Sequence, residues 1–153
     1  MSSFRDSSWS SRFSALGDMA EGAFEQYATD TLKLNFERFG LNRPQLRVAS
    51  LPSRVRHAPD YLMTNNFVEV VGFGKDQTMK LGLEKYGALH WWNDLKTKTF
   101  DGVQMFVWDS KNERGTMFPF LFLDDLLAEG KGGLDSFPEK KAYFSFRAED
   151  LFA

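Results

Sequence analysis

Acidic residues in two neighbouring segments of the chain could bind a metal ion. Asp60 precedes a short apolar run, and Glu69 lies nine residues later inside the apolar segment 67–71. A buried carboxylate is costly, so Glu69 must be neutral, hydrogen-bonded, ion-paired or bound to a metal. If both segments are adjacent strands, the two carboxylates converge on one hard cation, Mg²⁺ or Mn²⁺.

A third acid, Glu25, shares a helical stripe with apolar residues and therefore faces the body of the protein. Glu21, one turn earlier, is the competing choice. For any of these acids taken alone, a buried ion pair with Arg54 or Arg56 is the simpler explanation. Three acids in this arrangement, followed by lysines, favour a metal site instead.

These segments resemble the motifs of the PD-(D/E)XK nuclease superfamily, in particular its small Holliday-junction-resolvase-like members. The motifs are Gly22-Ala-Phe-Glu25, Pro59-Asp60 and Phe67-Val-Glu69-Val-Val, and the resemblance covers residues 17–110. It implies a metal-dependent DNA endonuclease with a restriction-endonuclease-like core. It also implies that Asp60, Glu69 and the backbone carbonyl of Val70 bind the metal, and that Glu25 helps to hold the metal or its water.

The chain departs from the superfamily at the catalytic lysine, where it has Val71. Three lysines follow: Lys75, Lys80 and Lys85. We expect Lys80 in the first turn of a helix packed beside the strand, from which it could reach the scissile phosphate, and Lys75 is the second choice. Gln77 matches a polar residue that often follows the core motif in the superfamily, although a solvent-facing side chain is the simpler explanation.

Basic and aromatic residues could provide the contacts to DNA. Four arginines without an intervening acid would contact flanking phosphates, unless they form a solvated loop: Arg43, Arg47, Arg54 and Arg56. Three tryptophans could stack on unpaired bases, unless they belong to an aromatic core: Trp91, Trp92 and Trp108.

The leading hypothesis is thus Mg²⁺- or Mn²⁺-dependent cleavage of DNA, on branched or phage substrates. The alternative is a catalytically inactive module that binds DNA or serves in phage assembly. This alternative is favoured by Val71, by the acidic C-terminal third and by the Ser/Arg-rich first residues. A homodimer is compatible with both hypotheses, and the aromatic residues 118, 120 and 122 could form its interface or belong to the core.

Composition excludes several other classes of protein. The 153 residues, 42% hydrophobic and 26% charged, are typical of one soluble domain. The net charge of −2 argues against a strongly basic nucleic-acid coat, although it can hide one locally basic surface. The absence of cysteine excludes disulfides, thiolate zinc sites and cysteine nucleophiles. The longest apolar run, 117–123, is too short to cross a bilayer, and no secretory signal is evident. We therefore expect a location in the host cytoplasm or in a virion, without membrane contact.

The residue pattern predicts an α/β (α+β) fold, with a single domain over residues 16–153 after a mobile Ser/Arg-rich arm at 1–15. A mixed central sheet flanked by helices is expected. Helices are predicted at 18–39, from 76 or 78 to about 95, and at 124–129. Strands are predicted at 45–51, 61–64, 67–71, 103–108 and 142–146, with 118–123 a strand or the approach to a helix, 130–133 a flexible link, and a hairpin turn at Asn65-Asn66.

Overall fold

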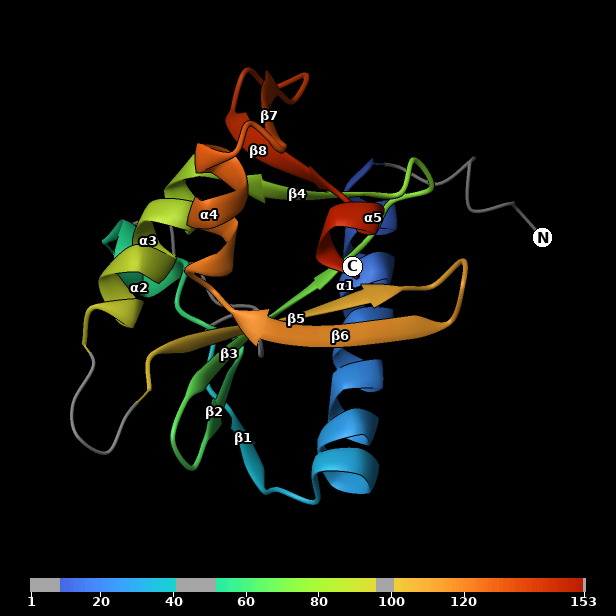
Figure 1. Cartoon of the computed structure of the whole chain (residues 1–153), viewed down its shortest axis with the longest axis vertical. Helices are drawn as coiled ribbons and strands as arrows, with labels where there is room; N and C mark the ends of the chain where they lie inside the picture. Colours follow the sequence, from blue (N-terminus) through green and yellow to red (C-terminus); the bar gives the residue numbers. More distant parts are fainter. Residues whose placement is uncertain (1–8, 41–51, 96–100, 153) are drawn as a thin grey trace.

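Two β-sheets organise the computed structural model of the chain, which describes residues 9–40, 52–95 and 101–152 (Figure 1). The larger sheet has five strands in the order β1 (Phe36–Arg38), β2 (Tyr61–Met63), β3 (Phe67–Gly72), β5 (Val103–Asp109) and β6 (Arg114–Pro119). Its β3–β5 pair is parallel and the other pairs are antiparallel. The smaller, antiparallel sheet has the order β4 (Thr78–Gly82), β8 (Ala142–Arg147) and β7 (Gly132–Ser136). The chain is therefore a mixed α/β domain, as the sequence predicts.

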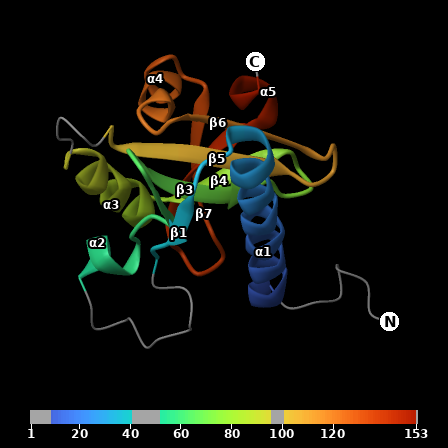
Figure 2. The same cartoon turned by 90° about the horizontal axis from the view of Figure 1, so that it is seen from below.

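Helices cover both faces of the larger sheet. The long helix α1 (Trp9–Tyr27) runs into the π-helical turn η2 (Ala28–Leu32). The shorter helices are α2 (Ser53–Arg56), α3 (Leu83–Asn93), α4 (Phe122–Ala128) and α5 (Ala148–Leu151). Figure 2 shows α1 on the opposite side of the sheet from α4 and α5. Within the described residues, none of the helices combines the length and the apolar character that a membrane crossing requires.

The central strand β3 contributes to a separate hydrophobic cluster on each face. Val68 and Val70 pack in one cluster with Phe24 of α1, whereas Phe67 and Val71 belong to the cluster on the other side. This burial on both faces explains why the strand is almost entirely apolar. Because side chains alternate along a strand, Glu69 lies on the side facing away from α1.

The predicted hairpin is confirmed. Strands β2 and β3 are antiparallel, with Tyr61 paired to Val68, and the Met63 N–H donates to the Asn66 carbonyl oxygen at 2.8 Å. The strands expected at 103–108 and 142–146 are present as β5 and β8, and the short helix expected at 124–129 is α4, which begins two residues earlier. The predicted strand at 45–51 lies outside the described residues.

The first helix differs from the prediction of 18–39 at both ends. It begins at Trp9, so that it includes part of the segment expected to be an arm, whose residues 1–8 lie outside the described ones. At its other end, Lys33 adopts a left-handed conformation with φ of 55°. Phe36 then pairs with Met63 in β1 and packs against Tyr61, with ring centroids 5.5 Å apart. Residues 36–38 therefore form a strand in place of the predicted last turn of the helix, and Phe36 still packs against the hydrophobic cluster that contains Phe24.

The second helix was predicted to start at residue 76 or 78, and this is wrong. Residues 78–82 form β4, and α3 begins at Leu83. Met79 and Leu81 are buried, alternate with half-buried positions, and pair with Phe146 and Phe144 of β8. The partner strand therefore decides the conformation of this segment. Of the link expected at 130–133, residues 132 and 133 are the start of β7, which pairs with β8, and only 130 and 131 lie outside a strand.

The aromatic residues at the end of the larger sheet belong to the core. Phe118 and Phe120 are buried, and Phe122 packs against the same hydrophobic cluster. Of the two explanations that the sequence left open for them, core or dimer interface, the structure therefore supports the core.

Phe24 anchors α1 to the sheet, and its removal should cost much of the stability. The side chain is fully buried, with its ring centroid 4.6 Å from Tyr61 and 5.4 Å from Phe106. We expect Phe24→Ala to lower the free energy of unfolding by about 3–5 kcal/mol, measured by urea titration. Met19→Ala, at a 45% exposed position of the same helix, should change it by less than about 0.5 kcal/mol. Equal losses of unfolding free energy in Phe24→Ala and Met19→Ala would contradict this packing of Phe24.

Candidate active site

Three charged side chains from separate segments meet beside the β2–β3 hairpin. Asp60 immediately precedes β2, whose pairing with β3 brings it next to Glu69, and its Oδ2 accepts a hydrogen bond from the Val70 N–H at 2.9 Å. Lys85, in the first turn of α3, has its Nζ 2.9 Å from Glu69 Oε2. The same Nζ donates to the Ala58 carbonyl oxygen at 3.1 Å. Two carboxylates and one ammonium group thus form a single cluster.

Burial governs the electrostatics of this cluster. Glu69 is 4% exposed, and its pKa is raised well above the ordinary range, first by burial and then by the Asp60 carboxylate. Burial alone would lower the pKa of Lys85, but the Glu69 and Asp60 carboxylates outweigh it and raise this pKa. Lys85 is therefore a charged ammonium group that compensates one of two neighbouring acids.

The cluster retains donor atoms that a divalent cation could use. Glu69 Oε1 is buried and has no hydrogen-bond partner. Within the described residues, no three His, Cys, Asp or Glu side chains group closely enough to hold a metal. The cluster therefore offers two carboxylates, those of Asp60 and Glu69. This number suits Mg²⁺, because that ion usually binds one or two protein carboxylates and keeps water or phosphate oxygens at its other coordination positions.

The lysine that contacts Glu69 is Lys85, and not Lys80 or Lys75, which the sequence favours. Lys80 lies on β4, where its Nζ is 3.4 Å from Asp76 Oδ2 and 5.6 Å from the centre of the Tyr143 ring. Lys75 lies in the turn between β3 and β4. The expectation of a lysine in the first turn of the following helix holds for Lys85, because α3 begins at Leu83. The later helix start thus places Lys85, and not Lys80, in that first turn.

Glu25 lies apart from the other two acids. It accepts hydrogen bonds from the Tyr61 hydroxyl and from Arg38 Nη2, both at 2.8 Å. Burial, followed by the hydrogen bond to Glu25, raises the pKa of Tyr61. Tyr61 belongs to the cluster on the α1 side of the sheet, whereas Glu69 is on the other side. The structure therefore ties Glu25 to β1 and β2 and does not bring it to Asp60 and Glu69.

Two of the four predicted DNA-binding arginines are on α2, which leads into Asp60. Arg54 is exposed, and Arg56 Nη2 lies 3.8 Å from Glu84 Oε2, which also contacts His57 Nε2 at 3.2 Å. The helices α2 and α3 lie side by side in both views (Figures 1 and 2). Arg43 and Arg47 lie outside the described residues.

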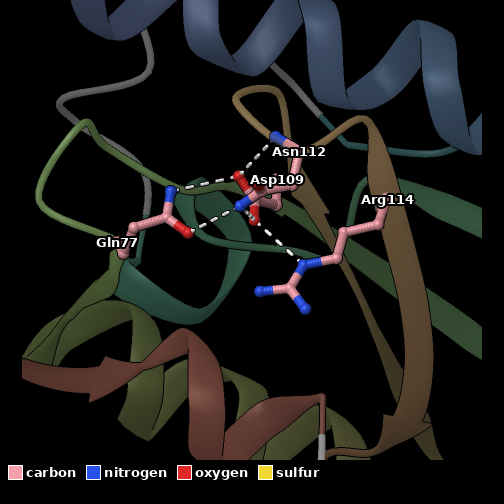
Figure 3. A network of polar contacts seen from close by, with 4 residues as sticks. All are labelled: Gln77, Asp109, Asn112 and Arg114. Atoms are coloured by element: carbon pink, nitrogen blue, oxygen red, sulfur yellow. Dashed lines mark hydrogen bonds and ion pairs between the residues drawn. The ribbon is translucent and has the colours of Figure 1, made fainter.

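A second polar cluster, which sequence reasoning missed, surrounds the fully buried Asp109 at the end of β5 (Figure 3). Its carboxylate accepts hydrogen bonds from Asn112 Nδ2 at 2.7 Å, Arg114 Nε at 3.0 Å and Gln77 Nε2 at 3.1 Å. Gln77 has a φ of 59°, and its carbonyl oxygen accepts from the Ala148 N–H. The cluster therefore joins the β3–β4 turn, the β5–β6 hairpin and α5. Gln77 is accordingly neither a solvent-facing residue nor part of the Asp60–Glu69–Lys85 cluster.

The Asp109 cluster should make stability depend on acidity in a defined range. Burial alone would raise the pKa of Asp109, but the hydrogen bonds from Asn112, Gln77 and Arg114 lower it to about 2. An unfolded Asp has a pKa of about 3.9, so this stabilisation is complete above pH 4 and lost as the pH falls toward 2. We expect Asp109→Asn to cost about 2 kcal/mol at pH 7 in urea titrations.

The difference in unfolding free energy between the wild type and Asp109→Asn should shrink as the pH approaches 2. The control Asp101→Asn, at an exposed position, should have nearly the same unfolding free energy as the wild type at every pH. A difference that stays constant from pH 7 to pH 2 would contradict this role of the carboxylate.

The Lys85–Glu69 pair should behave as a buried ion pair. Removing one partner leaves a buried charge, so Lys85→Met should cost about 3–5 kcal/mol of unfolding free energy at pH 8. Glu69→Gln in the same molecule should restore part of this loss, because it removes the orphaned charge. Lys80→Met, which breaks a more exposed pair, should cost less than about 1 kcal/mol. Equal losses of unfolding free energy in Lys85→Met and Lys80→Met would contradict a buried Lys85–Glu69 ion pair.

Comparison with known proteins gives a likeness of fold. No protein-family model matches the chain, and no curated protein sequence matches it significantly. Among solved structures, it is similar to that of D212, a nuclease from a fusselovirus, with a TM-score of 0.53 and 10% sequence identity. The superposition covers 94% of this chain and 86% of the viral protein.

Proposed function

We propose that this protein is a divalent-metal-dependent nuclease that hydrolyses DNA phosphodiester bonds at the Asp60–Glu69–Lys85 cluster. The observation that carries the proposal is the contact between Lys85 Nζ and the buried Glu69 carboxylate beside Asp60. It supplies the lysine that Val71 does not. The similar fold of a viral nuclease supports the proposal independently of these residues.

Each member of the cluster has a distinct role in this proposal. Asp60 and Glu69 hold Mg²⁺ or Mn²⁺, with the Val70 carbonyl as a further candidate ligand. When bound, such a cation polarises a phosphate and lowers the pKa of its water. The Lys85 ammonium group orients the attacking water and stabilises the negative charge that grows on the phosphate. Its buried contacts with Ala58 and Glu69 support this role, because they fix the ammonium group before the substrate arrives.

DNA is the proposed partner, in a branched or phage-derived form. Arg54 and Arg56 precede Asp60 by a few residues, so they are suited to contact phosphates on either side of the scissile bond. Arg43 and Arg47 keep the same role as a prediction from the sequence. These phosphate contacts position the substrate and do not select a sequence.

Cleavage assays with matched variants test the proposal. Labelled junction, flap, linear duplex and single-stranded DNA are incubated with Mg²⁺, Mn²⁺ or EDTA. We expect metal-dependent cutting by the wild type and at least a 100-fold loss in Asp60→Asn, Glu69→Gln and Lys85→Met, as roughly expected when electrostatic stabilisation of a transition state is removed. Lys80→Met, which changes a lysine outside the cluster, should cut like the wild type.

The alternative of an inactive module gives the opposite results. Folded wild-type protein would cut none of the substrates, and its melting temperature would not change with Mg²⁺ or Mn²⁺. A metal site predicts a rise in melting temperature with metal concentration, because the ion binds the folded state. Loss of that rise in Glu69→Gln would assign it to the cluster.

A further inference from the structure

Trp91 is a large aromatic residue on the surface between α2 and α3. It is 39% exposed, and the Arg54 guanidinium carbon lies 4.7 Å from the centre of its ring. The next residue, Trp92, turns inward: its Nε1 donates to the Arg54 carbonyl oxygen at 2.8 Å, and its ring packs against Phe67. Trp92 therefore fixes α2 to α3, so that Arg54 and Trp91 form a defined surface, here named the Arg54–Trp91 platform.

The helix surface next to this platform is open. Gly87 lies one turn before Trp91 on the same stripe of α3, because residues four apart share a helix face. A Cβ atom at position 87 would meet nothing within 4 Å. Any larger side chain there would stand beside the indole ring. Glycine thus leaves room for a flat group to approach Trp91.

The charges around the platform suit a phosphate. Arg54 is exposed, and the nearby Arg56 has a buried Nε without a hydrogen-bond partner. The acids on this side of α3 are Glu84, 3.8 Å from Arg56 Nη2 and 3.2 Å from His57 Nε2, and the exposed Asp94, three residues after Trp91. Arg54 thus places a guanidinium group directly over an exposed aromatic ring. An aromatic ring with arginines is the combination that binds unpaired nucleotides, through stacking and phosphate contacts.

The platform and the Asp60–Glu69–Lys85 cluster share helix α3. Trp91 follows Lys85 by six residues of the same helix, which corresponds to about 9 Å along its axis. Stacked nucleotides of one strand are about 3.4 Å apart, so this distance spans roughly two to three nucleotides. The chain from α2 to Asp60 passes through Ala58, whose carbonyl oxygen accepts the Lys85 hydrogen bond.

We propose that the Arg54–Trp91 platform binds an unpaired nucleotide of the DNA, with its base stacked on Trp91 and its phosphate at Arg54. This inference rests on the proposed nuclease function and adds to it the class of substrate. DNA with a single-stranded segment two to three nucleotides from the cut, as in a flap or a tailed duplex, is preferred to a blunt duplex.

Binding measurements test the inference separately from cleavage. Fluorescein-labelled blunt duplex and the same duplex with a thymidine tail are titrated with the wild type in EDTA, which prevents cutting. Stacking of one base contributes about 1–3 kcal/mol, so Trp91→Ala should weaken binding of the tailed duplex roughly 5- to 150-fold. Trp91→Phe should lose less, and Gly87→Leu should weaken tail binding by blocking the ring. Binding of the blunt duplex should not change in any of these variants.

Leu134→Ala is the matched control, because Leu134 is 67% exposed on β7; it should bind both DNAs like the wild type. Equal binding of the tailed duplex by the wild type and Trp91→Ala, or equal losses on tailed and blunt duplexes, would overturn the inference. Self-association that Trp91→Ala abolishes without changing DNA binding would also overturn it and assign the platform to a second copy. Absence of cleavage by the wild type in Mg²⁺, with tail binding intact, counts against the nuclease function alone.

Discussion

A carboxylate inside the central strand of the sheet is the constraint on which the candidate site depends. Glu69 has buried apolar neighbours on its own strand, so its charge is tolerable only with compensation close at hand. The strand itself cannot provide this compensation, because position 71 is valine. Lys85 therefore has to come from another element, and α3 must dock closely enough for a 2.9 Å contact. The docking of α3, which its buried residues Ala88 and Leu89 also hold in place, provides this contact.

The sequence is informative where local patterns decide the structure. The apolar run around Glu69 and the Asn65-Asn66 turn predict the β2–β3 hairpin, and the hairpin brings Asp60 to Glu69. The start of α3 was mispredicted because residues 78–82 form a strand with β8, more than sixty residues later in the chain. The same distant pairing hid the contact of Lys85 with Glu69. The Asp109 cluster combines residues from two turns, and no local pattern shows that these turns meet.

The structure separates acids that hold the fold from acids that could do chemistry. Asp109 is surrounded by donors that favour its charged form, and Glu25 is bound by Tyr61 and Arg38. In the Asp60–Glu69 pair, by contrast, burial raises the pKa of Glu69, and one oxygen of Glu69 remains without a hydrogen-bond partner. A satisfied carboxylate stabilises the folded chain, whereas an incompletely satisfied one retains binding capacity for a ligand. This contrast, together with the neighbouring Lys85, distinguishes Glu69 from Asp109 and Glu25.

Because Lys85 lies on a helix, the proposed metal ligands and the proposed catalytic ammonium group belong to different structural elements. The carboxylates lie on the β2–β3 hairpin, while the ammonium group moves with α3. If α3 opens locally, the lysine leaves the cluster while the hairpin and its acids stay in place. Under the proposed function, partial unfolding would then leave the two proposed metal ligands in place but remove the ammonium group proposed to act on the phosphate. The proposed nuclease would accordingly lose turnover before it loses metal affinity as heat or denaturant opens α3.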